Sequence, residues 1–239
     1  MDKLEKTENK IVFTTDIDET LANSIRRYVN HIQINAVDEV EISRNDSALY
    51  DETIAHRIGL IPLKAKASGK SGGKLKLETK KEGFVLSGDF SGDFEVVHKE
   101  IPITLLSSGQ EMAITAITKE GTGAEHSKFS PGLMFYRNVT EVTLDKEFLE
   151  EVRKVCPGIK IVEKGNKITI KDNGKDEIAD VCEGIANKKR KMADVEVKDE
   201  LVVTVESFGQ IEVAEIFKRS IETLKKDLNE VGKQASKAL

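Results

Sequence analysis

The stretch of sequence that decides the fold is LYDETIAHRIGLIPL, which occupies residues 49–63. The acidic pair at 51–52 opens a helical segment, where negative charge suits the exposed N–H groups of a first turn. Ile54 and Ile58 stand four residues apart, so they share one face of a short helix. Gly59 is placed to end that helix in the left-handed conformation. This spacing alone predicts a small helix that fills a core, and its functional meaning depends on the segments around it.

The composition is that of a globular protein, with 38% hydrophobic and 33% charged residues in a chain of 239. This length supports one sizeable core or two modest ones. No run approaches the ~20 apolar residues that span a bilayer, and the first residues lack the pattern of a signal peptide. Two cysteines give no disulfide framework, so we expect a cytoplasmic protein. The formal net charge of -5 argues against a surface that binds nucleic acid broadly.

A first amphipathic helix is predicted near the N-terminus, after a short strand at residues 11–13. Asp16 and Asp18 are candidate N-caps for this helix. Arg26 and Arg27 lie outside its apolar stripe, which is formed at helical spacing by Leu21, Ile25, Tyr28, Val29 and Ile32. A single helix of this kind commonly covers the sheet of its own domain.

Short strands dominate the next part of the chain. Residues 36–43 alternate like a strand, with Ala36, Val40 and Ile42 on one face. From residue 75 to residue 119, short alternating segments are separated by glycines. The pattern predicts an all-β insert.

Between these strands, residues 64–74 change in composition to Lys, Ala, Ser and Gly. Gly69-Lys70-Ser71 resembles the end of a phosphate-binding loop. Such a loop needs an earlier glycine, a preceding strand and a following helix, and none of the three is predicted here. We therefore expect a surface loop.

A second polar segment is GTGAEHSKFSP, residues 121–131, in which His126 follows Glu125. No nucleophile is placed beside this pair by a recognisable turn, so a catalytic dyad is disfavoured. A free-standing hydrolase that uses His56 or His126 meets the same objection, because no metal or oxyanion site accompanies either histidine.

A further strand at 139–143 is expected to close the all-β insert. The segment after it predicts a small ferredoxin-like module, with a helix at 146–155 capped by Asp145, a hairpin of 159–162 with 167–170 around Gly165-Asn166, and a helix at 178–186. The run Lys188-Lys189-Arg190-Lys191 follows. It is interpreted either as a solvated turn or as a local contact with phosphate or an acidic partner.

The cysteines decide the chemistry of this module. An iron–sulfur cluster usually takes three or four thiolates, and Cys156 and Cys182 stand alone. Zinc is disfavoured too, because His98 and His126 lie far off in the sequence. We expect no metal and no cofactor.

The C-terminal segment predicts a strand at 201–206, a cap at Ser207 and then a long helix. Its apolar residues step mostly by four and three, as in a coiled coil: Val213, Phe217, Ile221, Leu224, Leu228 and Val231. So regular a stripe favours packing against a partner or a second helix. The simplest arrangement is a dimerisation domain assembled from both chain ends, which carries the inserts.

Three landmarks together resemble the alpha-like subunits of multisubunit RNA polymerases, and most closely the D-type members of that family from archaea. They are NSIRR at 23–27 with DETIAHRIGLIPL at 51–63, then GTGAEHSKFSP at 121–131, then ESFG at 206–209 before the final helix. They occur in the family's order and extend over nearly the whole chain. Cys156-Pro157 matches the first cysteine of the family's cluster set and Cys182 matches another at most, so we expect the insert to fold without a cluster.

The resemblance implies an α+β fold in three parts. A discontinuous dimerisation domain takes residues 1–43 and 199–239, a mainly-β insert takes 44–143, and a ferredoxin-like insert without a complete cysteine set takes 144–198. It also implies a non-catalytic platform that pairs with the small alpha-like subunit L. The large catalytic subunits and small zinc-bearing subunits would assemble on that pair.

Site residues follow from the same resemblance. The heterodimer core is expected at Leu21, Ile25, Tyr28, Val29, Phe217, Ile221, Leu224 and Leu228. Contacts with the other subunits are expected at Arg26, Arg27, Asp51, Glu52, His56 and Arg57. A different class of function, a redox protein that uses the cysteine-bearing insert, is the alternative hypothesis.

Overall fold

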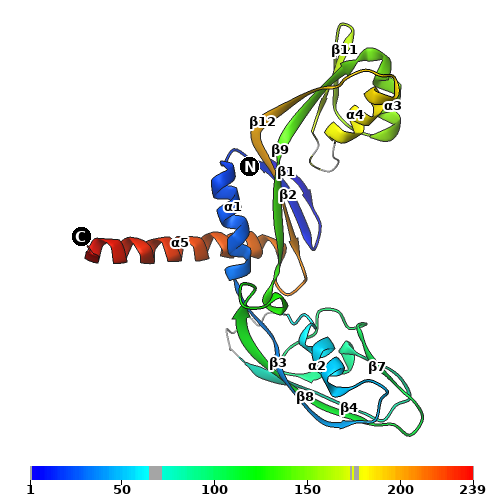
Figure 1. Cartoon of the computed structure of the whole chain (residues 1–239), viewed down its shortest axis with the longest axis vertical. Helices are drawn as coiled ribbons and strands as arrows, with labels where there is room; N and C mark the ends of the chain where they lie inside the picture. The colour runs from blue at the N-terminus through cyan, green and yellow to red at the C-terminus, as the bar shows by residue number, and fades with distance from the viewer. Residues whose placement is uncertain (1, 65–71, 173, 175–177, 239) are drawn as a thin grey trace. The chain divides into compact units, whose positions relative to one another are not determined.

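A computed structural model describes residues 2–64, 72–172, 174 and 178–238 of the chain. It divides into two compact units, each built from segments far apart in the sequence. The first contains Met1–Asn23 and Met134–Val205, and the second contains Ser24–Leu133 and Glu206–Leu239. Antiparallel sheets with a few helices make up both units, so the predicted α+β class is confirmed (Figure 1).

A six-stranded sheet organises the first unit, in the order β1-β2-β12-β9-β11-β10. Its strands are β1 Asp2–Lys6, β2 Lys10–Thr15, β9 Gly132–Asp145, β10 Ile161–Lys164, β11 Lys167–Lys171 and β12 Asp194–Ser207. The predicted hairpin is confirmed: Lys164 pairs with Lys167, and Gly165 has the positive φ of 60° that a two-residue turn requires. The strand predicted at 139–143 is the middle of the longer β9.

Two helices pack on one end of this sheet. The 3-10 turn η4, Lys146–Phe148, leads into α3, Leu149–Val155, and α4 spans Ile178–Lys188. Their core includes Phe148, Val152, Ile168, Ile170, Ile178 and Cys182. The predicted cap at Asp145 is wrong, because its side chain makes no capping bond and instead accepts a 2.6 Å hydrogen bond from Lys191 Nζ.

A buried carboxylate fixes the end of β11 in the first unit. The Asp172 side chain is 1% exposed and forms a bidentate pair with Arg137 of β9, in which Nη2 donates to Oδ1 at 2.9 Å. The backbone N–H groups of Gly174 and Thr140 donate to the same carboxylate at 2.7 and 3.3 Å. Burial alone would raise the pKa of Asp172, but these hydrogen bonds outweigh it and hold the pKa below its ordinary value.

The second unit contains a four-stranded sheet in the order β3-β8-β4-β6 and a two-stranded sheet β5-β7. The bounds are β3 Gln33–Asn45, β4 Gly73–Thr79, β5 Gly83–Leu86, β6 Ser91–Gly92, β7 Pro102–Leu106 and β8 Met112–Thr122. The short strands expected between residues 75 and 119 are therefore present, with the 3-10 turn η2 at Ser87–Asp89 between them. The predicted loop at 64–74 falls mostly on residues 65–71, and Gly69-Lys70-Ser71 lies outside the described residues.

Strand β3 differs from its predicted pattern. A bulge between Val37 and Glu39 adds a residue and changes which side chains share a face. Val37 therefore joins Val40 and Ile42 against the core of the second unit. The prediction that Ala36 belongs with Val40 and Ile42 is wrong for this reason.

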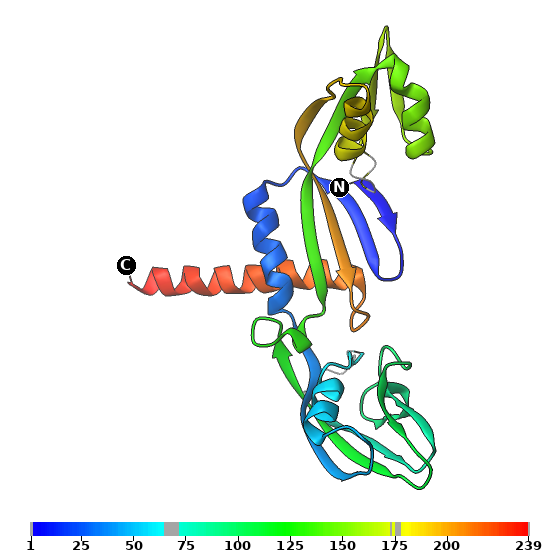
Figure 2. The ribbon, with the colours of Figure 1, turned by 45° about the vertical axis from the view of Figure 1, so that its right-hand side comes forward.

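The deciding stretch forms α2, Asp51–Gly59, as predicted. Figures 1 and 2 show it lying across the sheet of the second unit, and it contacts β3 and β7. Ile54 and Ile58 are fully buried there. Gly59 is not left-handed, which corrects the prediction: the N–H of Leu60 bonds the carbonyls of Arg57 and Ile58, so the last turn closes without a left-handed residue.

Two helices remain, α1 at Glu19–Tyr28 and α5 at Val213–Ala238, with the 3-10 turn η1, Val29–His31, directly after α1. The predicted cap at Asp18 is confirmed, since its Oδ1 accepts the Leu21 N–H at 2.9 Å. Ser207 does not cap α5, which begins six residues later. Its Oγ donates to the carbonyl of Ile211 at 2.6 Å and accepts the Gly209 N–H at 2.9 Å, so it shapes the turn before the helix. No helix in the described part of the chain is long and apolar enough to cross a membrane.

Removing the buried anchor of α2 should destabilise the second unit. Ile58→Ala leaves a cavity beneath the helix, so we expect a loss of about 3 kcal/mol in the free energy of unfolding. Leu60→Ala is the matched control, because Leu60 is 49% exposed. Urea unfolding followed by circular dichroism suits a chain without tryptophan. Equal losses in the two variants would contradict the proposed anchoring.

The buried Asp172 carboxylate predicts a pH-dependent stability in the first unit. Its pKa is lower in the folded than in the unfolded chain, so its stabilisation is complete above the unfolded value of about 3.9 and is lost as the pH falls through the folded value. We expect Asp172→Asn to cost about 1–3 kcal/mol at neutral pH, and the gap to the wild type to narrow below pH of about 4. Asp199→Asn, at an exposed position, should show neither effect when urea unfolding is repeated across pH.

Candidate subunit interface

The candidate site is the apolar stripe of α5, which passes from covered to exposed along the helix. Val213 and Ile216 are buried in the second unit, at 2% and 0% exposure. The next apolar residues of the stripe are half-buried, and these are Phe217, Ile221 and Leu224. Farther along, two large apolar residues stay open, Leu228 at 61% and Val231 at 62%. The chain therefore covers only the N-terminal half of its own stripe.

The start of α5 is held by close backbone packing. A Cβ atom at Gly132 would lie 2.1 Å from the carbonyl oxygen of Glu206 and 2.9 Å from Cδ1 of Ile216. Only glycine allows this approach. The N–H of Phe208 also donates to the carbonyl of Pro131 at 3.0 Å. These contacts fix where the helix begins.

The α1 residues predicted for the interface lie in different environments. Ile25 and Val29 are buried, whereas Leu21 is 43% exposed. Tyr28 is half-buried, and its ring stacks on His31 with 4.7 Å between ring centroids. Burial raises the pKa of Tyr28, and the Asp227 carboxylate on α5 adds to the rise. The role of these side chains toward a partner stays a prediction.

Val231 continues the exposed stripe but was not among the predicted site residues. It follows Leu228 by three residues, so the two lie on one face of the helix. That spacing was visible in the sequence. What spacing could not reveal is that the chain leaves both side chains uncovered.

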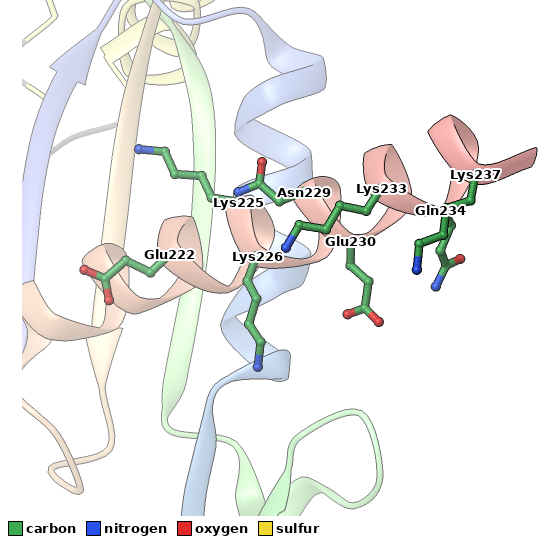
Figure 3. A pocket seen from close by; sticks show the side chains of 8 residues that line it. All are labelled: Glu222, Lys225, Lys226, Asn229, Glu230, Lys233, Gln234 and Lys237. Carbon is green, nitrogen blue, oxygen red and sulfur yellow. The ribbon is translucent and has the colours of Figure 1, made fainter. Parts of the chain in front are cut away.

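The opposite face of α5 is polar. Figure 3 shows eight side chains around a shallow hollow along the end of the helix, and these are Glu222, Lys225, Lys226, Asn229, Glu230, Lys233, Gln234 and Lys237. All come from one helix, with no second element to enclose a ligand. This arrangement describes the outer face of an amphipathic helix and not a ligand pocket.

The charged residues predicted to contact other subunits lie on α1 and α2. Arg26 and Arg27 are exposed. On α2 two of the four are used within the chain: Asp51 Oδ1 accepts a hydrogen bond from Asn45 at 2.8 Å, and Arg57 Nη1 donates to the carbonyl of Ile103 at 2.8 Å. The Glu52 and His56 side chains are exposed and make no hydrogen bond or ion pair with other described residues.

The segment 121–131 forms a structural junction in the second unit, with the 3-10 turn η3 at Ser127–Phe129. The Asn30 side chain accepts a hydrogen bond from the Ser130 hydroxyl at 2.8 Å, and the Asn30 backbone carbonyl accepts one from the Ala124 N–H at 3.0 Å. Lys128 pairs with Asp38 of β3 at 2.8 Å. His126 uses its Nδ1 to accept the Lys128 N–H at 3.1 Å, so this nitrogen orients the loop.

The cysteine pair lies in the core of the first unit. Cys182 is 0% exposed and Cys156 is 6% exposed, and neither is in a disulfide. Burial raises the pKa of the Cys182 thiol to about 11, and the neighbouring Cys156 thiol adds to the rise. Two thiols are too few for an iron–sulfur cluster, which usually takes three or four thiolates. Among the described residues no group of three or more His, Cys, Asp or Glu could hold a metal ion.

Two of the four basic residues at 188–191 form ion pairs within the first unit. Lys191 pairs with Asp145 at 2.6 Å and with Glu147 at 2.9 Å, and Lys189 pairs with Glu151 at 3.4 Å. The hydrogen bonds from the two carboxylates raise the pKa of Lys191 to about 12. The run therefore ties the turn after α4 to the start of α3, which favours the interpretation as a solvated turn.

Comparison with known proteins agrees with this arrangement. The chain is 37% identical to DNA-directed RNA polymerase subunit Rpo3 of Pyrococcus horikoshii over 158 residues, which cover 60% of this chain and 61% of that protein. It is 36% identical to Rpo3 of Pyrococcus furiosus over 168 residues, 64% of each chain. It is 34% identical to Rpo3 of Archaeoglobus fulgidus over 164 residues, 60% of this chain and 62% of the relative. The matched region thus spans less than two thirds of these relatives.

The match to a protein family is broader. The family described as RNA polymerase Rpb3/Rpb11 dimerisation domain matches residues 12–228, which include the deciding stretch and most of α5. With the alpha-like landmarks already in place along the sequence, the chain belongs to the Rpb3/Rpb11 dimerisation-domain family of RNA polymerase subunits.

Proposed function

We propose that this chain is a non-catalytic assembly subunit of a cytoplasmic, archaeal-type DNA-directed RNA polymerase. The observation that carries the proposal is the apolar stripe of α5, which continues beyond the chain's own core at Leu228 and Val231. An amphipathic helix that its own chain covers only in part is suited to pairing with a second subunit. The family's description as a dimerisation domain supports the same interpretation.

The partner we propose is the small alpha-like subunit L. Phe217, Ile221 and Leu224, together with Leu228, would form the α5 side of the heterodimer, and Leu21, Ile25, Tyr28 and Val29 the α1 side. The proposed dimerisation domain is formed by residues 1–43 and 199–239, with inserts at 44–143 and 144–198. Apolar burial along such a seam contributes about 1.5–3 kcal/mol for each large side chain, before the cost of association.

The resulting pair would dock the large catalytic subunits and small zinc-bearing subunits. Glu52 and His56 support this step best, because both side chains are exposed and have no partner among the described residues. Arg26 and Arg27 are further candidates. The chain's acidic net charge of -5 favours protein contacts over direct contacts with DNA.

The heterodimer seam can be tested by placing charges on it. We expect Leu228→Asp/Val231→Asp to weaken co-purification with subunit L by roughly 100-fold or more, because two apolar contacts are lost and two charges must be desolvated. Both side chains are more than 60% exposed, so the chain should still fold. Multi-angle light scattering of the purified mixture would measure the 1:1 complex.

The matched control is Lys226→Asp/Lys233→Asp, which introduces the same side chain on the polar face shown in Figure 3. This variant should pair like the wild type. A folded wild-type chain that remains alone beside subunit L, or seam and control variants that pair equally, would overturn the proposal.

The alternative redox function has no supporting observation, since the two thiols are buried and too few for a cluster. We expect protein purified without oxygen to contain no stoichiometric iron and to show no visible absorbance. Cys156→Ser/Cys182→Ser sets the baseline for iron analysis. Iron bound in the wild type well above that baseline would revive the redox hypothesis.

A further inference from the structure

The four-stranded sheet of the second unit has an inner face toward the core and an outer face. Residues paired across neighbouring strands point to the same side of a sheet, so the register separates the two faces. Val40 of β3, Ala116 of β8 and Leu75 of β4 form one such row, and they pack in the core together with α2. The next residues along each strand therefore point outward.

Two outward-pointing rows share one arrangement of charge. From β3 through the central β8 to β4, the first row is Glu39, Ile117 and Lys74, and the second is Glu41, Thr115 and Lys76. The four charged residues are exposed, and the two central residues are half-buried. The outer face thus has an acidic edge on β3 and a basic edge on β4.

The bulge in β3 makes the acidic edge possible. In a regular strand Val37, Glu39 and Glu41 would share one face, because side chains alternate. The extra residue between Val37 and Glu39 lets Val37 and Val40 both pack in the core. Glu39 and Glu41 are then left on the outer side.

The chain itself does not neutralise these charges. The side chains of Glu39, Glu41, Lys74 and Lys76 make no hydrogen bond or ion pair with other described residues. The two edges lie two strand spacings apart, which is about 10 Å.

Charges at one end of the same sheet behave differently. Arg44 pairs with Asp46 at 3.1 Å and with Glu111 at 2.9 Å, and Lys80 pairs with Glu111 at 2.9 Å. The chain therefore pairs the charges at this end of the sheet and leaves the two rows at its centre open.

We propose that this outer face binds a segment of another polymerase subunit, one with basic side chains opposite Glu39 and Glu41 and acidic side chains opposite Lys74 and Lys76. The inference rests on the proposed function and deepens it by assigning a docking surface separate from α5. Two edges of opposite charge fix the orientation of a protein partner. A phosphate backbone would suit the basic edge but would be repelled by the acidic edge.

The size of the face disfavours a second copy of this chain as its occupant. Two copies related by a two-fold axis parallel to the strands would place Lys74 of one opposite Glu39 of the other. The rows span about 10 Å by 7 Å, on the order of 100 Å², whereas a stable interface buries roughly 800 Å² per partner. Such a surface suits an assembly in which other contacts also hold the partner.

The test reverses one edge at a time. Lys74→Glu/Lys76→Glu reverses the basic edge, Glu39→Lys/Glu41→Lys reverses the acidic edge, and a quadruple variant reverses both. The matched controls make the same changes on the polar face of α5 shown in Figure 3, as Lys226→Glu/Lys233→Glu and Glu222→Lys/Glu230→Lys. Each chain is paired with subunit L, and the affinity of the pair for the purified large catalytic and small zinc-bearing subunits is measured at low and high salt.

We expect each single-edge reversal to weaken binding about ten-fold at low salt, because like charges then face each other. The loss should shrink at high salt, where exposed charges are screened. The quadruple variant should bind more weakly still, since the partner keeps its own charges. Pairing with subunit L should not change in any edge variant, which shows that the chain is folded. Wild-type binding by both edge variants, or equal losses in the controls, would overturn the docking surface.

Two further outcomes would assign the face to a different occupant and so overturn the proposal. The first is a wild-type dimer in light scattering of the chain alone that both single-edge variants lose and the quadruple variant restores, because a face with both edges reversed again complements itself. The second is binding of duplex DNA that Glu39→Lys/Glu41→Lys strengthens. If the wild-type pair itself fails to bind the other subunits, the proposed function is wrong. If it binds and the edge variants bind equally, only the docking surface is wrong.

Discussion

The covering of apolar surface on α5 is the constraint on which the rest of this structure depends. A 26-residue amphipathic helix cannot hide its stripe by itself, and here the second unit covers only the first half. The backbone contact at Gly132 and the turn at Ser207 hold that half in place. The exposed half leaves Leu228 and Val231 in water, and covering them would release free energy of burial.

Charged groups in the first unit are handled in the opposite way, because the chain itself pairs them. Asp172 receives a bidentate arginine and two backbone N–H groups, so its charge is fully compensated inside the first unit. Lys191 likewise pairs with two carboxylates, and so it connects the turn after α4 to the residues that precede α3. Electrostatic interactions therefore consolidate the first unit, whereas part of the apolar stripe on α5 stays exposed.

Local periodicity revealed much of this fold from the sequence. Ile54 and Ile58 predicted α2, Asp18 predicted the start of α1, and Gly165 predicted a hairpin, because each signal depends on residues within a few positions of it. The interface stripe on α5 was readable for the same reason. Its spacing identified the face, although spacing could not say that the exposure begins after Leu224.

The wrong predictions share a physical cause, which is that distant parts of the chain compete with local signals. Asp145 looked like a helix cap, but Lys191 supplies a charged partner 46 residues away. The bulge in β3 arises from its pairing with β8 and shifted Val37 into the core.

The three landmark segments can now be understood through what their polar groups do. In α2, Arg57 binds the backbone of β7 and Asp51 binds Asn45. In the segment 121–131, the Ser130 hydroxyl donates a hydrogen bond to Asn30, and the Lys128 amine pairs with Asp38. Before α5, the Ser207 hydroxyl closes a turn whose Gly209, with a φ of 90°, lies against Val97. Polar groups committed to placing backbone segments are poorly suited to acid–base work on a substrate. Such a pattern suits a protein whose task is to hold surfaces in fixed positions.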